Sequence, residues 1–238
     1  NICEFTQIEQ IGHLTELTDS RAYIVHMSTG EGVDICKRFQ ERGVNLHAET
    51  LPAFLTHTKD EEELGVWGKI SPPLRGEWSK DRLWQGLREG TVEYMGTDHC
   101  PHKIAFKEKD TGKHGDIWDA IPGDNNGIEY FLPVMMSEGV NRNRISMERL
   151  VEVCAENNAK RWGLYPRKGA LVEGSDADMV VVDMEKSKVV DDDFYHTMEP
   201  RYSTMHGMEL TGLPTHTVVG GEVVVEDDEL QVESGGRN

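Results

Sequence analysis

Residues 94–102 read YMGTDHCPH and bring an aspartate, a cysteine and two histidines within five positions. Carboxylate, imidazole and thiolate groups are the usual protein ligands of transition metals, and the first two also transfer protons in catalysis. The same residue types are common in polar turns, where an aspartate after Gly-Thr often acts as a cap. The stretch therefore allows three interpretations: a metal cluster, an acid–base site or a polar turn.

The segments around this stretch alternate between strand and helix patterns. Short apolar or β-branched runs predict three strands, over residues 22–27, 44–50 and 91–97. A helix follows the first strand, with Ser28 or Thr29 as its N-cap and its end at Gly43, and a second helix opens at Ser79 and stops at Gly90. Strands that alternate with helices predict parallel βαβ units, as in a barrel or a doubly wound sheet.

The pattern changes near residue 166. Two helix patterns precede this point, whereas apolar runs broken by glycine and aspartate follow it. Gly220-Gly221 separates two β-rich runs, which is a strong signal for a hairpin. We therefore predict an α/β domain over residues 1–165 and a small β-rich domain over residues 166–238.

His26 stands at the end of the first predicted strand, and Asp98 comes just past the third. In α/β proteins, and in (β/α)8 barrels above all, catalytic side chains lie at this end of the strands. Two candidate ligands thus project from the same edge. Position alone leaves a packing histidine and a capping aspartate as an equally good interpretation.

The charge of the chain limits its classes of partner. Its 238 residues include 43 acidic and 25 basic ones, a formal net charge of −18. This balance argues against binding to nucleic-acid phosphates or to an anionic membrane surface. The acidic residues are scattered along the chain, which favours a salt-adapted, halophilic surface.

Targeting signals and cysteine usage indicate the compartment. No apolar run approaches the roughly 20 residues of a membrane span, and no signal peptide is visible. The four cysteines lie far apart and form no CxxC pair. We therefore expect a reduced, cytoplasmic protein.

Six motifs follow one another along the chain: YIVHMS, ETLPAFL, SPPLRGE, GTDHCPH, RKGALVEGSDADMVVVD and TGLPTHTVVGGEVVVED. In these motifs the chain resembles the cyclic amidohydrolases of the dihydropyrimidinase and hydantoinase group, with allantoinase and dihydroorotase as more distant relatives. The resemblance implies an α/β fold, namely the C-terminal part of a metal-dependent-hydrolase (β/α)8 TIM-like barrel plus a small β-sandwich-type domain. It also implies a homo-oligomer, a tetramer in many relatives.

The resemblance further implies a site for two divalent metal ions, usually zinc, at the mouth of the barrel. Members of the group bind them with a His-x-His pair, a carboxylated lysine, two single histidines and one aspartate. His26 matches a single histidine and Asp98 matches the aspartate, so these two are the implied metal ligands. The sequence holds no His-x-His pair. The other ligands would lie upstream of Asn1, so the chain resembles the C-terminal portion of a longer enzyme.

The implied reaction is the opening of a small cyclic amide, a dihydropyrimidine or a hydantoin. An unstrained amide resists attack by water, and a bound zinc ion can lower the pKa of water from 15.7 to about 7. By resemblance, Asp98 is the general base that takes the proton from this water. It then acts as the acid that delivers the proton to the departing ring nitrogen.

Substrate contacts are implied at two loops. Ser71 in SPPLR matches a serine whose backbone contacts the substrate ring. A serine there favours dihydropyrimidinase or hydantoinase over dihydroorotase and allantoinase. In the loop 121–129 the sequence departs from the group at four consecutive positions, so Asn125 or Asn126 is only a candidate for substrate binding.

The other residues of the opening stretch receive different roles. Adjacent side chains on an extended segment point in opposite directions, so we interpret His99 as a structural partner of Asp98 and not as a ligand. Cys100 matches a family cysteine that binds no metal, and we interpret it as a packed thiol. His102 replaces the aromatic residue usual at its position, and its role stays open.

Two alternatives stay open. Dihydropyrimidinase-like proteins that have lost metal ligands share the fold and serve as assembly or signalling partners, although His26 and Asp98 favour the enzyme. An inactive fragment is the other alternative, because two ligands from half a barrel would bind metal weakly and free strand edges would promote association. The upstream sequence discriminates between them, since a His-x-His pair and a suitable lysine would support hydrolysis.

Overall fold

The computed structural model describes residues 1–100, 102–109, 111–123, 127–196 and 202–232. The chain forms two compact units. Unit 1 consists of residues 1–131 and 189–208, and unit 2 consists of residues 132–188 and 209–238. The predicted domains, 1–165 and 166–238, stay predictions, because a compact unit within a chain is not by itself an independent domain.

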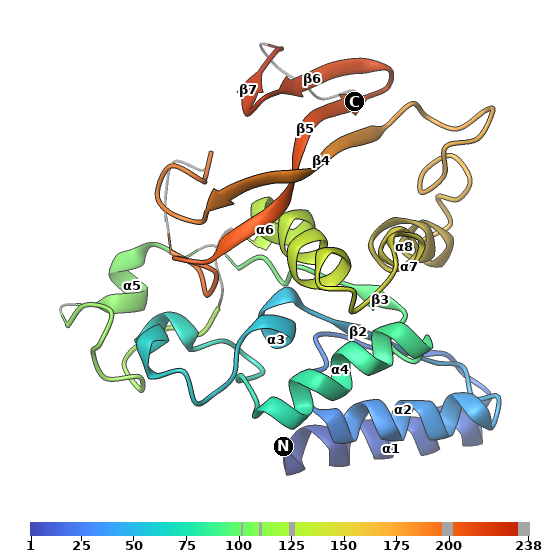
Figure 1. The fold of residues 1–238 in the computed structure, drawn as a ribbon. Helices are drawn as coiled ribbons and strands as arrows, with labels where there is room; N and C mark the ends of the chain where they lie inside the picture. Colours follow the sequence, from blue (N-terminus) through green and yellow to red (C-terminus); the bar gives the residue numbers. More distant parts are fainter. Residues whose placement is uncertain (101, 110, 124–126, 197–201, 233–238) are drawn as a thin grey trace. The chain divides into compact units, whose positions relative to one another are not determined.

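Unit 1 is built on a sheet of three parallel strands. They are β1 (Ala22–Ile24), β2 (Leu46–Thr50) and β3 (Tyr94–Met95), in the order β1-β2-β3. Figure 1 labels β2 and β3. Ala22 pairs with Leu46, and Glu49 pairs with Tyr94. β2 is the central strand, and its residues alternate between buried and half-buried, as the period of two in a strand requires. The predicted parallel direction of the strands is confirmed.

The first and third strands are shorter than the apolar runs that predict them. β1 ends before His26 and β3 ends before Asp98, and both residues have a positive φ, 39° and 41°. An extended strand cannot pass through this left-handed region, so the regular pairing stops there. The chain after β1 still runs beside β2, because the Met27 N–H donates to the carbonyl oxygen of Glu49 at 2.8 Å.

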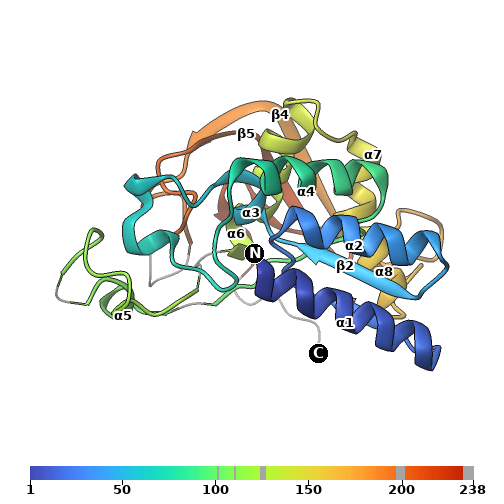
Figure 2. The same cartoon turned by 90° about the horizontal axis from the view of Figure 1, so that it is seen from below.

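Three helices, α1 (Ile2–Thr18), α2 (Gly30–Glu41) and α4 (Glu77–Glu89), lie side by side in unit 1 (Figure 1, Figure 2). The buried face of α2 carries Val33, Cys36 and Phe39, which recur at the spacing of a helical face. Of the two predicted cap residues, Ser28 and Thr29, it is Thr29 that caps α2, because its Oγ1 accepts a hydrogen bond from the Gly32 N–H at 3.3 Å.

The predicted start of α4 at Ser79 is wrong. The helix begins at Glu77 after Gly76, and Ser79 lies inside it, buried. The Ser79 Oγ accepts a hydrogen bond from the Gly30 N–H at 3.1 Å, so this serine ties α4 to the start of α2. The predicted end is confirmed, since Gly90 has a φ of 96° and closes the helix.

Shorter helices complete unit 1: α3 (Pro52–Thr56), the 3₁₀ helix η1 (Glu62–Gly68), α5 (Ile104–Glu108) and the beginning of α6 (Gly127–Val134). The segment 189–208 also belongs to this unit. Its Tyr202 is buried, with the ring centre 6.2 Å from that of Trp67. The core of unit 1 therefore includes residues from a distant part of the sequence.

Unit 2 contains a helical part and a sheet. The helical part holds the end of α6, the π-helices η2 (Met135–Asn141) and η3 (Glu152–Glu156), α7 (Met147–Val151) and α8 (Asn157–Arg161). The sheet has the strand order β4 (Met179–Val189), β5 (Glu209–Val219), β6 (Glu222–Glu226) and β7 (Glu229–Leu230). β5 pairs with β6 in antiparallel direction, and Gly220-Gly221 joins them with positive φ at both positions, so the predicted hairpin is confirmed.

The predicted mixed α/β class is confirmed by the parallel sheet of unit 1 and the helices that pack with it. A closed barrel and the second sheet of a β-sandwich stay predictions, because the described residues hold one three-stranded and one four-stranded sheet. Within this described part of the chain, no helix combines the length and the apolar character needed to cross a membrane.

Candidate active site

Both predicted metal ligands lie at one edge of the sheet of unit 1. His26 follows β1, Asp98 follows β3, and β2 runs between these strands. The three strands are parallel, so their carboxyl ends meet at the same edge, with neighbouring strands about 4.8 Å apart. In parallel α/β folds this edge is where functional side chains gather.

The side chains of these two residues are available for a ligand. His26 is half-buried and Asp98 is exposed, and within the described residues neither side chain makes a hydrogen bond or an ion pair. A neutral imidazole and a carboxylate with unused lone pairs suit a divalent metal ion. The described residues contain no group of three or more His, Cys, Asp or Glu side chains that could hold a metal. His26 and Asp98 thus fit a metal site only together with ligands from outside the described residues.

Glu49 lies on β2, near the same edge of the sheet. β2 is the strand between β1, which precedes His26, and β3, which precedes Asp98. The Glu49 carboxylate accepts a hydrogen bond from the Tyr23 hydroxyl at 2.8 Å, and its Oε1 lies 3.4 Å from the His26 N. A Cβ atom at Gly96 would come within 2.5 Å of this carboxylate, so glycine leaves the space that Glu49 fills. No local signal in the sequence marks these contacts of Glu49, which is only one letter of the ETLPAFL motif.

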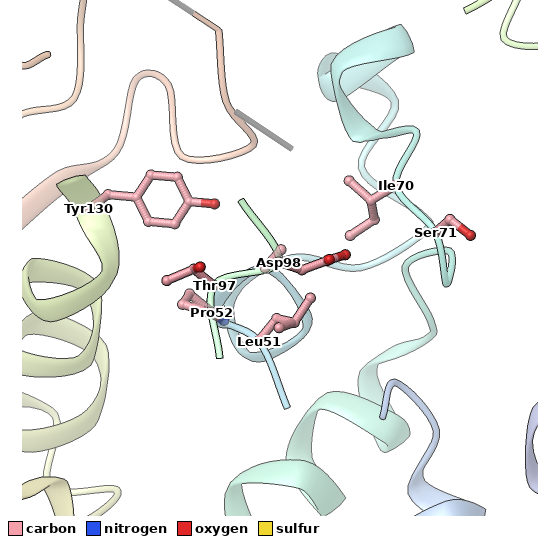
Figure 3. A pocket seen from close by; sticks show the side chains of 8 residues that line it. Leu51, Pro52, Ile70, Ser71, Thr97, Asp98 and Tyr130 are labelled. Atoms are coloured by element: carbon pink, nitrogen blue, oxygen red, sulfur yellow. The ribbon is translucent and has the colours of Figure 1, made fainter. Parts of the chain in front are cut away.

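Asp98 lines a pocket in unit 1 (Figure 3). The lining residues are Leu51, Pro52, Ala53, Ile70, Ser71, Thr97, Asp98 and Tyr130. Apolar walls with a few polar groups are typical of sites for small organic ligands. The structure therefore brings the predicted residues Asp98 and Ser71 to one pocket, whereas His26 is not among the residues that line it.

Two side chains of the pocket point in different directions (Figure 3). Ser71 is exposed and its side chain points away from Asp98, which leaves the backbone of this loop nearer to the pocket. Tyr130 comes from α6, is almost fully buried, and points its hydroxyl toward the pocket. Tyr130 lies in an ordinary helix pattern without a motif of its own, so the sequence gives no signal for its place in the pocket.

Lys107 and Lys69 anchor the loop before Ser71 through hydrogen bonds to backbone carbonyl groups. Lys107 is fully buried, and its Nζ donates to the carbonyl oxygens of Lys69 at 2.5 Å and Gly123 at 2.6 Å. Lys69 in turn donates from its Nζ to the carbonyl oxygen of Ala120 at 2.6 Å. These contacts join the loop of Ser71 to the segment that ends at Gly123.

The second predicted substrate loop is described only in part. Its candidate residues, Asn125 and Asn126, lie outside the described residues. The start of the loop is anchored, because the Gly123 N–H donates to the carbonyl oxygen of Lys69 at 3.1 Å.

The remaining residues of the opening stretch contact one another or the backbone. The His99 N–H donates to the Thr97 Oγ1 at 3.3 Å, and the His99 Nδ1 is buried without a partner among the described residues. The Cys100 Sγ lies 3.3 Å from the His102 Nε2. Asp98 is thus the one residue of the stretch YMGTDHCPH that combines a titratable side chain with a place in the pocket wall, among those described.

The chain belongs to the amidohydrolase family, whose model matches residues 9–224. Within that family it is similar to hydantoinases. The L-hydantoinase of Paenarthrobacter aurescens is 39% identical over 216 residues, which cover 90% of this chain and 46% of the relative. The D-hydantoinase of Geobacillus stearothermophilus is 34% identical over 225 residues, with 91% of this chain and 46% of the relative covered.

Solved structures agree with these sequence matches. The L-hydantoinase (dihydropyrimidinase) from Arthrobacter aurescens has a TM-score of 0.88 and 35% identity, over 96% of this chain and 50% of that chain. The dihydropyrimidinase from Brevibacillus agri NCHU1002 has a TM-score of 0.86 and 30% identity, over 95% of this chain and 49% of that chain. The predicted resemblance is confirmed, and the chain spans about half the length of these relatives.

Proposed function

We propose that the chain forms part of the active site of a metal-dependent hydrolase that opens a cyclic amide, either a dihydropyrimidine or a hydantoin. The observation that carries this proposal is the place of Asp98. Its carboxylate lies at the carboxyl edge of a parallel sheet, in the wall of a largely apolar pocket, with no protein partner among the described residues. The hydantoinase and dihydropyrimidinase names of the relatives support this class of ring.

His26 and Asp98 are the residues of this chain that would hold the metal. We propose two zinc ions per complete site, with the other ligands supplied from outside these 238 residues. When bound, a divalent metal supplies a water that ionises near neutral pH and a Lewis acid for the amide carbonyl. The imidazole and carboxylate of this chain suit zinc, which accepts nitrogen and oxygen ligands.

Asp98 would also move the proton. In our proposal its carboxylate takes a proton from the attacking water and then delivers it to the ring nitrogen that leaves. The C–N bond breaks in this second step, and the open-chain acid departs with the amide nitrogen protonated. An exposed carboxylate without a competing ion pair among the described residues is suited to both transfers.

The pocket residues would form one wall of the site that binds the ring. In our proposal Leu51, Pro52 and Ile70 supply apolar surface for the ring atoms, and the backbone near Ser71 binds the ring amide. Expelling water from this surface strengthens the electrostatic contacts of Asp98. We therefore assign Ser71 to substrate binding through its backbone and not through its hydroxyl.

We also propose that the complete protein has the rest of the predicted architecture. Further parallel strands would close the barrel and bring the missing ligands to the edge that carries His26 and Asp98. A homo-oligomer, a cytoplasmic location and a salt-adapted surface are parts of the same prediction. Size-exclusion chromatography and activity as a function of KCl concentration test the first and the last of these.

The direct test uses the complete enzyme, meaning the polypeptide that supplies the remaining metal ligands, beside the 238-residue chain. Elemental analysis and turnover of dihydrouracil and hydantoin are measured on both. Two metals per subunit of the complete enzyme with ring opening, and little metal on the 238-residue chain, are the expected results. A metal-free and inactive complete protein would contradict the proposal and favour a non-enzymatic relative.

A further inference from the structure

A partly buried ion pair reaches the loop that carries Ser71. Glu4, in the first turn of α1, accepts a hydrogen bond from the Arg75 Nη2 at 2.9 Å. Each of the two side chains is only 14% exposed. Arg75 lies in the SPPLR segment, four residues after Ser71. The pair therefore connects the start of α1 with the candidate substrate loop.

The same carboxylate also holds the chain that follows His26. Glu4 accepts hydrogen bonds from the N–H groups of Ser28, at 2.8 Å, and Thr29, at 3.0 Å. Both hydroxyls donate to it as well, at 2.5 and 3.0 Å. Ser28 and Thr29 are fully buried, and Thr29 is the N-cap of α2. The candidate metal ligand thus stands two residues before a segment that Glu4 anchors.

Arg75 contacts both partners at once. Its Nη2 donates to Glu4, and its Nε donates to the Ser28 Oγ at 2.9 Å. The planar guanidinium group presents these donors in a fixed geometry that a lysine ammonium does not reproduce. Arg75, in the loop after η1, therefore contacts the loop after β1 directly at Ser28 and a second time through Glu4 of α1.

Glu4 stays charged in this setting. Burial by itself raises the pKa of the Glu4 carboxyl, but hydrogen bonds from Ser28, Arg75 and Thr29 outweigh burial and hold the pKa below its usual value. Removing one partner of such a pair leaves the other charge poorly compensated. A change in either Glu4 or Arg75 therefore affects all the hydrogen bonds that the two side chains share with Ser28 and Thr29.

We propose that Glu4 and Arg75 are positioning residues that couple the His26 loop to the Ser71 loop. Metal retention and substrate binding then depend on one shared ion pair. The roles of His26 and Ser71 rest on the proposed function, whereas the coupling is a property of this chain alone. Apolar residues of similar volume often stabilise a protein as much as an ion pair does. In our proposal the contribution of the Glu4–Arg75 ion pair is instead to fix the orientation of both loops.

The first test needs no activity. Amide hydrogen exchange is measured on the 238-residue chain for the wild type, Glu4→Gln and Arg75→Gln. We expect each substitution to accelerate exchange by about tenfold or more in both segments, 26–29 and 69–76. Acceleration in only one segment, or in neither, would overturn the coupling.

A matched control comes from another ion pair of unit 1. The Arg82 Nε donates to the Asp34 Oδ1 at 2.7 Å, and the Arg82 side chain is 11% exposed. Arg82→Gln should leave exchange in both loop segments unchanged. If a glutamine variant at Glu4 or Arg75 fails to fold, Arg75→Lys replaces it. Lysine keeps the charge but lacks the planar guanidinium group that donates to Glu4 and Ser28 at once. Arg75→Lys should still accelerate exchange in both segments, and protection as in the wild type would overturn the proposal.

The second test uses the complete enzyme. Arg75→Lys should raise the KM for the cyclic amide and also accelerate the loss of metal to a chelator, whereas Arg82→Gln should change neither. A raised KM with metal loss unchanged would overturn the coupling. If the wild-type enzyme opens no cyclic amide while both loops still respond in the exchange experiment, the proposed function fails and the coupling stands.

Discussion

His26 and Asp98 share a left-handed backbone conformation, with φ values of 39° and 41°, at the ends of the two strands that flank β2. Few residues with a Cβ adopt this region, and those that do are concentrated at turns and functional sites. The surrounding contacts must therefore hold each residue in place. This common conformation at one sheet edge supports the proposal that the two residues serve one site.

Asp98→Asn tests the general base. Asparagine has the same shape and tolerates a positive φ, so we expect the fold and the melting temperature to stay close to those of the wild type. It cannot accept the proton of the attacking water, so kcat of the complete enzyme should fall by a factor of about 10² to 10⁴ or more. Steady-state kinetics with dihydrouracil and hydantoin measure the effect, and near-normal turnover would remove Asp98 as the base.

Backbone strain and chemistry at this position can be separated. Asp98→Ala also removes the carboxylate, but alanine is disfavoured at a φ of 41°. We expect Asp98→Ala to lose about 1 kcal/mol more of the free energy of unfolding than Asp98→Asn. Equal stability of the two variants in urea titrations would show that the left-handed conformation costs nothing here.

His26→Ala tests the second candidate ligand. Without the imidazole, the metal content of the complete enzyme should fall from two ions to about one per site. His26→Asn is the matched control, since asparagine tolerates the positive φ that alanine does not. Elemental analysis should give the same loss for both variants. Unchanged metal stoichiometry in His26→Asn would take His26 off the list of ligands.

Lys107→Met tests whether the hydrogen bonds of Lys107 hold the candidate substrate loops in position. Methionine fills a similar volume but leaves the carbonyl oxygens of Lys69 and Gly123 without the donors that Lys107 supplies. We expect a loss of about 1–3 kcal/mol in the free energy of unfolding and a raised KM with a smaller change in kcat. Lys103→Met, at an exposed position nearby, should change neither quantity. A normal KM in Lys107→Met would show that these loops keep their positions without the buried ammonium.

The contribution of Glu4 to stability depends on pH. Its pKa lies below the usual 4.5 in the folded chain, despite burial, because of hydrogen bonds from Ser28, Arg75 and Thr29. A lowered folded pKa means that the carboxylate contributes in full above about pH 4.5, and that this contribution is lost as the pH falls through the folded value. The stability difference between the wild type and Glu4→Gln, measured by urea unfolding, should therefore shrink from pH 6 to pH 3. A difference that stays constant over this range would contradict the assignment.

Cys36 provides an independent marker of the fold. Burial, with a further contribution from the negative charge of Glu93, raises the pKa of Cys36 to about 12, and the side chain is fully buried. Iodoacetamide at pH 8 should therefore modify the exposed Cys3 and leave Cys36 intact, as read by mass spectrometry. Both thiols should react in 8 M urea. Rapid labelling of Cys36 without urea would show that α2 is not packed as described.

Local signals in the sequence predicted much of the fold. Alternating strand and helix patterns indicated that β1, β2 and β3 are parallel, Ser28 or Thr29 was expected to cap the helix after β1, and Gly220-Gly221 marked the hairpin. Each of these features depends on residues within a few positions of one another, so a single sequence is enough to reveal them. The prediction of Ser79 as a cap was wrong for the same reason: a buried serine that contacts another helix resembles a cap when only its neighbours in the sequence are considered.

The sequence by itself also placed His26 and Asp98 at strand ends and linked their motifs to a family of hydrolases. Only the tertiary structure decided which loops meet around them. Glu4 and Arg75 are 71 residues apart, and Lys107 contacts a carbonyl group 38 residues away, with no periodic pattern to connect them. Such contacts depend on the path of irregular loops, which is set by the packing of the helices and strands between them and not by the propensities of the residues involved.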